Sequence, residues 1–348
     1  MDAIIPLFIP HRGCPHQCSF CNQESITGCS EASLSEYVND FVDEIEKWLS
    51  RFKDTGSVEV AFYGGSFTCL PEQEQHLLLS VVQPYIQSGR VSSIRLSTRP
   101  DCLSEGIIAF LKDYGVKKVE LGVQSLDDRV LQKSKRGHKA EDSINSILLL
   151  RKAGVEVGVQ LMVGLPGENT TSFLTGVNLL GKIKPDFVRL YPVVVVKNSE
   201  LEKQYQADSY KPLTMNKAIA LATLFQLRMQ QFNIPVIRIG LQPSREIESQ
   251  LVTGPFHPSF GELVKSRIWL KRIREYFNRV PDGVSVTLNI SDRDLSSVVG
   301  LKKMNIDRLR QLGLEERLLI KTDKNIERGN FEFTVSNSSE VQLWKHEN

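Results

Sequence analysis

Three cysteines gather near the start of the chain, in the segment HRGCPHQCSFCNQ (residues 11–23). Cys14, Cys18 and Cys21 are half of the six cysteines in a sequence of 348 residues. Thiolates are common ligands of zinc and of iron–sulfur clusters, and two thiols can also be oxidised to a disulfide. These three chemistries require different companion residues, so the rest of the sequence helps to choose between them.

A structural zinc site needs four ligands, and His11 or His16 could supply the fourth. Against zinc, the sequence shows no second Cys/His pair that would complete such a site. A disulfide would leave one of the three thiols unpaired and is unusual in a reducing compartment. A [4Fe–4S] cluster is the third alternative. Such clusters normally take four thiolates, and three thiolates would leave one iron open to a small molecule.

The composition indicates an ordinary globular protein. Hydrophobic residues make up 41% and charged residues 24% of the chain, and the formal net charge is +2. This charge by itself does not indicate nucleic acid or an anionic membrane as a partner. No apolar run approaches the roughly 20 residues of a membrane span, so no membrane partner is expected. The first residues, MDAIIPLFIP, lack the basic region and the cleavage site of a signal peptide.

We therefore expect a cytoplasmic location, where clustered cysteines indicate metal or redox chemistry rather than disulfides. Cys29, Cys69 and Cys102 stand apart from the cluster and from one another. We expect these three to be ordinary small core or surface residues.

The elements that would position the cysteines alternate along the chain. Short apolar segments, expected as strands, alternate with segments whose apolar residues recur at the helical spacing of three and four. Right-handed crossovers would assemble such units into a parallel sheet. Six units fit either a barrel or an open doubly wound sheet, and periodicity alone does not decide. The expected strands are 4–9, 58–64, 93–97, 118–123, 155–162 and 187–193, and the expected helices are 34–52, 72–87, 103–114, 126–153 and 170–182.

Unusual residues follow each of the six expected strands. Glycine pairs such as Gly64–Gly65 usually serve tight turns, and Gln124 and Ser125 would suit a buried polar pair, so each motif alone is a weak signal. Ligands and catalytic groups gather at the carboxyl ends of parallel strands. Six motifs at six strand ends therefore predict one functional site. The motifs are the cysteine segment, YGGSFT (63–68), STRPD (97–101), GVQS (122–125), VGLPGEN (163–169) and YPVVVVKNS (191–199).

The last third of the sequence differs in character. A helix expected at about 214–232 leads into a short strand-like segment, 234–240, and a loop-like stretch rich in proline and glycine follows. Beyond it, a helix at 261–277 and a helical segment at 305–313 mix with β-like segments at 283–290 and 331–335. We expect a barrel domain over 1–240 and a smaller α/β extension over 241–348.

The spacing of the cysteines, Cys-x3-Cys-x2-Cys with the aromatic Phe20 before the last one, resembles the signature of the radical S-adenosylmethionine (SAM) superfamily. YGGSF is similar to the glycine-rich stretch of that superfamily. FYGGSFT, TRPD, ELGVQS, RGH and LYPVVVVKNSEL together resemble the radical SAM part of the Elongator catalytic subunit. GLPGE and GVQS are also similar to oxygen-independent coproporphyrinogen III oxidase. The resemblance is good over about residues 4–200 and weaker beyond 240.

This resemblance implies a partial (β/α)6 barrel of the TIM type, with the α/β extension behind it. It implies that Cys14, Cys18 and Cys21 ligate a [4Fe–4S] cluster and that SAM occupies the open iron. Reductive cleavage of SAM would then give a 5′-deoxyadenosyl radical that abstracts hydrogen from a substrate. It further implies an electron donor of the flavodoxin or ferredoxin type.

The SAM contacts implied by the oxidase pattern are Phe8, Gly64, Gly65, Ser66, Gln124 and Arg136. At two further positions the chain departs from that pattern: Ser97 stands where an acidic residue is usual, and Gln160 where an aspartate is usual. A hydroxyl and an amide can still hydrogen-bond to ribose but add no negative charge. The basic stretch KSKRGHK (133–139) is either a solvated loop or an anion site for the SAM carboxylate or a substrate phosphate.

The substrate stays open between three hypotheses. By analogy with the Elongator subunit the substrate is tRNA, although 348 residues leave no room for that subunit's acetyltransferase domain beside a six-unit barrel. The second hypothesis is a small molecule, a tetrapyrrole or an unknown metabolite, which the near-neutral net charge favours. The third is a non-catalytic zinc-, SAM- or haem-binding module.

Overall fold

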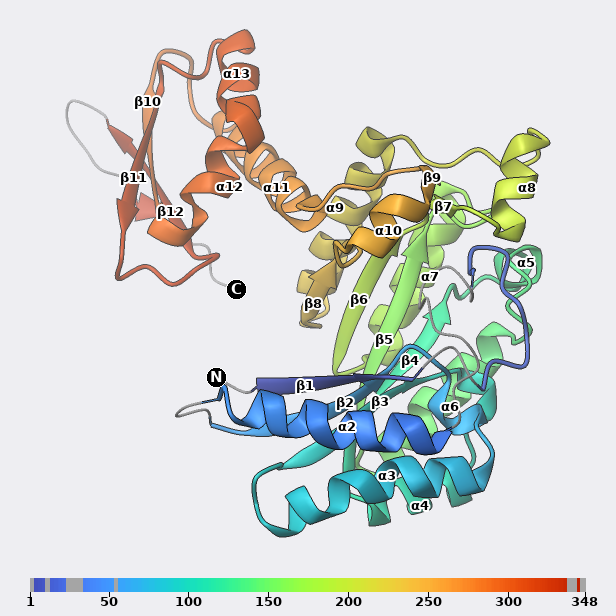
Figure 1. The fold of residues 1–348 in the computed structure, drawn as a ribbon. Helices are drawn as coiled ribbons and strands as arrows, with labels where there is room; N and C mark the ends of the chain where they lie inside the picture. Colours follow the sequence, from blue (N-terminus) through green and yellow to red (C-terminus); the bar gives the residue numbers. More distant parts are fainter. Residues whose placement is uncertain (1–2, 10–12, 23–33, 53–55, 337–342, 345–348) are drawn as a thin grey trace. The chain divides into compact units, whose positions relative to one another are not determined.

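The computed structural model describes residues 3–9, 13–22, 34–52, 56–336 and 343–344 (Figure 1). The chain forms two compact units, Met1–Pro258 and Ser259–Asn348. No helix in these described ranges is both long and apolar enough to cross a membrane.

A seven-stranded parallel sheet, curled into a half-barrel, is the centre of the first unit (Figure 1). Every neighbouring pair of strands in it is parallel, which confirms the α/β partial barrel expected from the sequence. The short segment expected after the sixth unit joins the sheet as its seventh strand. In spatial order the strands are β1 (Ala3–Phe8), β2 (Val58–Tyr63), β3 (Ser93–Thr98), β4 (Val116–Gln124), β5 (Glu156–Val163), β6 (Phe187–Pro192) and β8 (Val236–Ile239).

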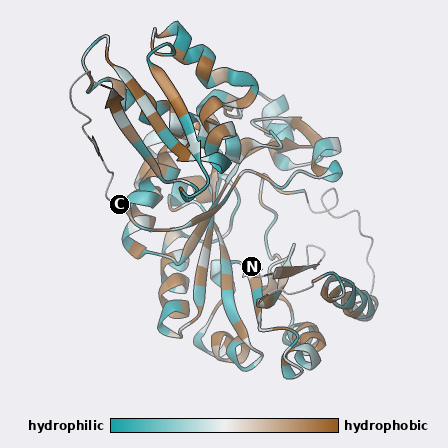
Figure 2. Ribbon diagram, turned by 90° about the vertical axis from the view of Figure 1, so that its left-hand side faces the viewer, coloured by the Kyte–Doolittle hydropathy of each residue, from teal (hydrophilic) through white to brown (hydrophobic). Residues whose placement is uncertain are grey.

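Amphipathic helices connect these strands, and hydrophilic and hydrophobic residues alternate along them (Figure 2). In α2, Phe41 and Ile45 are buried, and the Phe41 ring lies 6.2 Å from the ring of Phe62 on β2. Burying a side chain of this size contributes about 1.5–3 kcal/mol. The helices are α2 (Leu34–Leu49), α3 (Glu72–Gln87), α4 (Glu105–Asp113), α5 (Asp128–Lys133), α6 (Ala140–Lys152), α7 (Thr170–Ile183), α8 (Glu200–Gln206) and α9 (Met215–Gln231).

The segment 126–153, expected as one helix, forms two helices. α5 ends at Lys133 and α6 begins at Ala140, because Lys135 and Gly137 between them have φ values of +52° and +83°. A left-handed residue cannot continue a right-handed helix. The break turns the basic stretch 134–139 into a loop at the carboxyl ends of the strands.

The segment between residues 241 and 258 packs with the first unit. Within it, α10 (Arg245–Gln250) leads into β9 (Leu251–Thr253), which pairs antiparallel with β7 (Val195–Val196). This pairing attaches residues 251–253 to the first unit, which extends to Pro258. The domain limit at residue 240 stays a prediction.

The second unit is an α/β structure with its own core. Its four-stranded sheet has the order β11-β10-β12-β13, in which β10 and β11 are parallel. The buried residues Trp269, Ile273, Val286, Leu288 and Phe333 form its core. The sequence pattern missed β11, because its residues LLIKTD are half exposed or polar. The elements are α11 (Phe260–Phe277), β10 (Ser285–Ser291), α12 (Leu295–Val299), α13 (Met304–Gln311), β11 (Leu318–Asp323), β12 (Phe331–Ser336) and β13 (Leu343–Trp344).

Candidate functional site

The cysteine segment lies at the carboxyl end of β1, beside the loops that follow the other strands. Cys14, Cys18 and Cys21 are all free thiols; Cys18 is buried and the other two are partly exposed. Backbone hydrogen bonds fix the segment on both sides. The N–H of Ser19 donates to the Ser134 carbonyl at 3.0 Å, and the N–H of Leu201 donates to the Ser19 carbonyl at 2.7 Å.

Burial raises the pKa of two of these thiols, Cys14 and Cys21, in the cluster-free chain. Burial is the main cause that raises the pKa of Cys14. Burial and the neighbouring Cys18 and Cys14 thiols raise the pKa of Cys21 to about 12. Among the described residues no three His, Cys, Asp or Glu side chains converge as a ready-made site for one metal ion. Of the two histidines considered as a fourth zinc ligand, His11 lies outside the described residues. The ring of His16 packs against Gly137, where a side chain would collide with it.

Two arginines lie beside the thiols. Arg136 donates from Nη1 to Cys18 Sγ at 3.4 Å and from Nη2 to the Gly122 carbonyl at 2.5 Å. Arg99 donates from Nη2 to the Arg136 carbonyl at 2.6 Å and pairs with Asp101 at 2.8 Å.

Each of these buried arginines has one nitrogen that donates no hydrogen bond to a described residue. Arg99 Nη1 and Arg136 Nε have no hydrogen-bond partner among the described residues. A buried polar group without a partner costs about 1–3 kcal/mol, and guanidinium groups are the preferred partners of anions. Three thiols flanked by two guanidinium groups with unused donors therefore fit a cofactor with thiolate-bound iron and a carboxylate.

The turn after β2 approaches the cysteine segment closely. Gly64 has a φ of +99°, and a Cβ on it would lie 2.5 Å from the Ile9 carbonyl oxygen. A Cβ on Gly13 would likewise lie 2.5 Å from the Ser66 carbonyl oxygen. Gly65 is partly exposed and Ser66 is buried, with its Oγ 3.2 Å from Thr98 Oγ1. Glycine is needed at positions 13 and 64 because backbone meets backbone there.

The ends of β4 and β5 bring two glutamines together. Gln160 donates from Nε2 to Gln124 Oε1 at 3.4 Å. Gln124 is buried and has a φ of +66°, a conformation that costs about 1–3 kcal/mol for a non-glycine residue and is typical of functional sites. Ser97 on β3 donates its hydroxyl to the Phe62 carbonyl at 3.3 Å.

The structure brings some of the expected site residues into contact and leaves others apart. Arg136 contacts Cys18 directly, and Gln124 and Gln160 contact each other. Phe8 is 63% exposed, and the centre of its ring lies 6.2 Å from that of Tyr63. In the basic stretch, Lys135 pairs with Glu200 at 3.2 Å rather than with another part of the site.

The loop after β5 holds a partly buried acid, Glu168. The Gly164 N–H donates to the Glu168 carboxylate at 2.6 Å, and the Tyr210 hydroxyl donates to the Gly164 carbonyl at 2.7 Å. Burial raises the pKa of Glu168 to about 7, although two backbone N–H groups act against the rise. Glu168 fixes the loop rather than facing the thiols.

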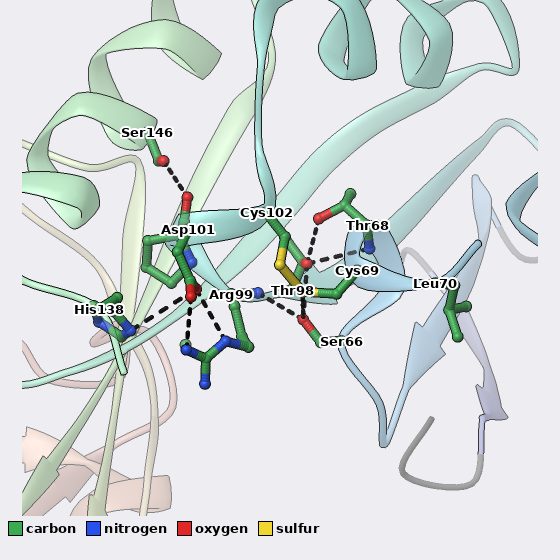
Figure 3. Close-up of a disulfide and its surroundings, with 12 residues drawn as sticks. Ser66, Thr68, Cys69, Leu70, Thr98, Arg99, Asp101, Cys102, His138 and Ser146 are labelled. Carbon is green, nitrogen blue, oxygen red and sulfur yellow. Dashed lines mark hydrogen bonds and ion pairs between the residues drawn. A yellow bond between two sulfur atoms is a disulfide. The ribbon is translucent and has the colours of Figure 1, made fainter. Parts of the chain in front are cut away.

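The expectation for two of the lone cysteines is wrong. Cys69 and Cys102 form a disulfide whose Cα atoms lie 5.3 Å apart (Figure 3). The two cysteines are 33 residues apart in the sequence, but they follow the neighbouring strands β2 and β3, and their shared position after adjacent strands was the available signal. Cys29 lies outside the described residues.

Sequence reasoning also missed a charged cluster inside the half-barrel. Glu120 on β4 accepts from Tyr63 at 3.1 Å, pairs with Arg189 at 2.9 Å and lies 3.5 Å from Arg95. Alternation places Tyr63 on the face of the sheet opposite to Phe62, which packs on α2. The signal was present: single charged residues interrupt the apolar strands VEVAFYG, SIRLS, KVELGV and FVRLYPV.

Two family models match the chain. The model of the radical SAM superfamily matches residues 8–180, and that of the radical SAM C-terminal domain matches residues 185–269.

Curated relatives extend this similarity. The uncharacterized protein MJ0486 of Methanocaldococcus jannaschii is 30% identical over 228 residues, which cover 61% of this chain and 68% of that protein. The tRNA uridine(34) acetyltransferase of Methanocaldococcus infernus is 26% identical, with 78% of this chain and 57% of that protein covered. The haem chaperone HemW of Bacillus subtilis is 26% identical over 52% of this chain and 48% of its own length. The chain thus spans about half the length of the last two relatives.

Solved structures share the fold. The Elp3 structure from Methanocaldococcus infernus has a TM-score of 0.61 at 21% identity and covers 78% of this chain and 63% of its own. The coproporphyrinogen III oxidase HemN of Escherichia coli has a TM-score of 0.50 at 17% identity, and the match covers 66% of this chain and 52% of HemN. Both carry the half-barrel architecture described above.

Proposed function

We propose, because this chain belongs to the radical SAM superfamily, that it is an enzyme in which Cys14, Cys18 and Cys21 hold a [4Fe–4S] cluster beside bound SAM. The observation that carries the proposal is the placement of three free thiols next to Arg99 and Arg136, each of which has one buried nitrogen without a partner among the described residues. When bound, the two groups together supply one-electron cleavage of SAM to methionine and a 5′-deoxyadenosyl radical, which abstracts hydrogen from a substrate.

The residues of the chain bind and orient the cofactors. Arg136 bridges Cys18 and the end of β4, so it holds the thiol in place and leaves Nε free for an anion. Gly64 and Gly65 bring backbone N–H groups to the cofactor without an intervening Cβ. Ser66 is fixed by Thr98 and orients this turn.

Four residues from neighbouring strands would complete the pocket. Gln124 and Gln160 offer amide groups to the ribose, and Ser97 offers a hydroxyl that is now bonded to Phe62. Phe8 offers an exposed ring on β1. None of the four brings a charge, so the arginines and the thiols dominate the electrostatics of the site.

The substrate we favour is tRNA, because a tRNA uridine(34) acetyltransferase is similar to this chain over 78% of its length. A small-molecule substrate is the second candidate, supported by the fold shared with HemN. A non-catalytic haem-binding role is the third, supported by the similarity to HemW. An electron donor of the flavodoxin or ferredoxin type and a cytoplasmic location complete the proposal.

Anaerobic reconstitution with iron and sulfide, followed by dithionite and SAM, tests the proposal. We expect a brown protein that releases 5′-deoxyadenosine, and a Cys18→Ala variant that loses both colour and cleavage. A Cys29→Ala variant, which removes a thiol outside the proposed ligand set, should keep both. Bound zinc without iron, or a cluster that never cleaves SAM, would contradict the enzymatic proposal.

The same assay with and without bulk tRNA separates the substrates. Binding of tRNA through phosphate contacts should weaken steeply as salt rises. If no tRNA binding is detected at low salt, the tRNA proposal is wrong, and comparison of small metabolites in a deletion strain becomes the decisive measurement.

A further inference from the structure

The Cys69–Cys102 disulfide lies where two loops of the proposed SAM site meet. Cys69 closes the short helical turn η1 (Phe67–Cys69) that follows β2, and Cys102 closes the turn η2 (Pro100–Cys102) that follows β3. The glycine turn Gly64–Gly65 directly precedes η1. The disulfide is therefore a covalent link between η1, which follows the glycine turn, and the segment that carries Arg99 (Figure 3).

A network of hydrogen bonds surrounds the link on the side of β2 (Figure 3). Ser66 Oγ lies 2.9 Å from Cys69 Sγ and accepts from the Arg99 backbone N–H at 3.1 Å. Thr98 Oγ1 lies 2.6 Å from Thr68 Oγ1 and accepts from the Thr68 N–H at 3.2 Å. These bonds keep their geometry only while the two turns stay together.

On the side of β3 the link reaches the arginine pair. Asp101, next to Cys102, pairs with the Arg99 side chain at 2.8 Å and lies 4.0 Å from His138. The Pro100 carbonyl accepts from Ser146 on α6 at 2.6 Å. Displacement of Cys102 would thus be transmitted to Arg99, whose Nη1 has no hydrogen-bond partner among the described residues.

The glycine turn also contacts the cysteine segment. A Cβ on Gly13 would lie 2.5 Å from the Ser66 carbonyl oxygen and 3.1 Å from the Leu70 nitrogen. The turn closed by the disulfide is therefore packed against the residue that precedes Cys14. Neither sulfur-bearing residue is fully buried, so small thiols and disulfides can reach both cysteines.

We propose that Cys69 and Cys102 are a redox modification site that sets the affinity of the neighbouring turn for SAM. The disulfide holds the glycine turn and Arg99 in the arrangement that binds the cofactor, and the dithiol lets the two turns move apart. This role rests on the proposed function of the site. Disulfides in reducing compartments are usually of the sensing or catalytic kind rather than structural.

The interconversion is a thiol–disulfide exchange. The thiolate of a small dithiol attacks one sulfur of the pair and breaks the S–S bond, and its second thiolate resolves the mixed disulfide. Cys69 and Cys102 take up two protons and two electrons, and the small dithiol becomes a cyclic disulfide. Oxidation by a small disulfide is the reverse of this exchange.

The test uses the full chain with its reconstituted cluster, under argon and without dithionite, so that SAM binds but is not cleaved. One sample is equilibrated with reduced and one with oxidised dithiothreitol, and differential alkylation with mass spectrometry reports the state of Cys69 and Cys102. We expect SAM to bind about fivefold more weakly to the dithiol form, because an ordered turn binds with less loss of entropy. The C69S/C102S double variant should match the dithiol form under both conditions.

Hydrogen–deuterium exchange of the peptide covering 64–70 gives a readout that does not need SAM. We expect slower exchange in the disulfide form, and no redox dependence in C69S/C102S. The proposal is overturned if oxidised dithiothreitol leaves both cysteines open to alkylation, or if the two forms bind SAM equally. If neither form binds SAM, the proposed function is contradicted. Hydrogen–deuterium exchange then tests separately whether the disulfide orders the turn. Slower exchange on oxidation supports this ordering, and unchanged exchange overturns it.

Discussion

The close approach of the Gly64 turn to β1 can be tested with one methyl group. In a Gly64→Ala variant the new Cβ would lie 2.5 Å from the Ile9 carbonyl oxygen, and the residue would keep a φ of +99°. Gly89→Ala is the matched control, because Gly89 has a φ of +73° and no atom within 4 Å of the position of a Cβ. The two variants share the cost of a left-handed alanine and differ in the contact.

The expected difference follows from these two terms. A left-handed alanine costs about 1–2 kcal/mol, and the lower entropy of the unfolded chain offsets about 0.4–1 kcal/mol of that. The control should therefore lose no more than about 1.5 kcal/mol. Relieving a contact with a backbone oxygen requires the main chain to shift, which costs about 1–3 kcal/mol more. Gly64→Ala should thus be less stable than Gly89→Ala by about 1–3 kcal/mol.

Urea unfolding of the cluster-free full chain, followed by far-ultraviolet circular dichroism, measures this difference. SAM binding to the reconstituted proteins gives the second readout: Gly64→Ala should bind at least about tenfold more weakly, because a shift of 1.4 kcal/mol is a factor of ten. The control should bind like the wild type. Equal unfolding free energies for the two variants would refute the steric argument. Equal SAM affinities would show that the glycine turn does not contribute to SAM binding.

The remaining predictions concern buried charges. Because burial raises the pKa of Glu168 to about 7, the folded state binds more protons than the unfolded state between about pH 4.5 and 7. The free energy of unfolding should therefore fall by up to about 3 kcal/mol as the pH rises through this window. Glu168→Gln should remove this fall, measured by urea unfolding at pH 5 and 8. The same pH dependence in the wild type and the variant would contradict the prediction. Glu120→Gln leaves the partly buried Arg189 without its acid, whereas Arg95 keeps its pair with Glu59. This variant should cost about 3 kcal/mol, of which the E120Q/R189M double variant should recover at least half. Strict additivity in that double-mutant cycle would show that Glu120 and Arg189 do not interact. Arg136→Lys keeps the charge but cannot span Cys18 and the Gly122 carbonyl together, so it should retain iron and lose about tenfold or more in SAM cleavage; undiminished cleavage would exclude that bridging role.

Local sequence patterns were sufficient to predict most helices and strands of the half-barrel. The helix expected at 72–87 has the same bounds in the structure, and strand β2 differs by one residue, because an apolar run followed by a glycine turn leaves little choice. The helical spacing over 126–153 does not show the break at 134–139, although the basic stretch 133–139 is a loop in one of its two interpretations. Lys135 has no local reason to be left-handed, and the loop depends on contacts with His16 and the cysteine segment, which lie more than 100 residues away in the chain.

The candidate site shows the same limit. Strand-end motifs located the glycine turn, the arginine loop and the thiols, because parallel strands bring their carboxyl ends to one edge. The partners of individual atoms depend on side-chain packing between loops, which no spacing encodes. The bond between Arg99 and the Arg136 carbonyl and the Cys69–Cys102 pairing are therefore results of the structure. The assignment of the individual SAM contacts stays a prediction.

The two arginines also favour the binding of an anionic cofactor beside the three thiols. Asp101 neutralises Arg99, but nothing in the described residues neutralises Arg136, whose Nη1 points at a thiol rather than at a carboxylate. An isolated buried cation is costly unless a negative charge lies beside it. Iron-bound thiolates and a carboxylate would supply that charge, whereas protonated thiols do not. Loading the cluster and SAM should therefore stabilise the first unit beyond the effect of the iron–sulfur bonds alone. Arg136→Met should reduce the gain in stability on loading more than it reduces the stability of the cluster-free chain; the opposite order would show that Arg136 is a structural residue.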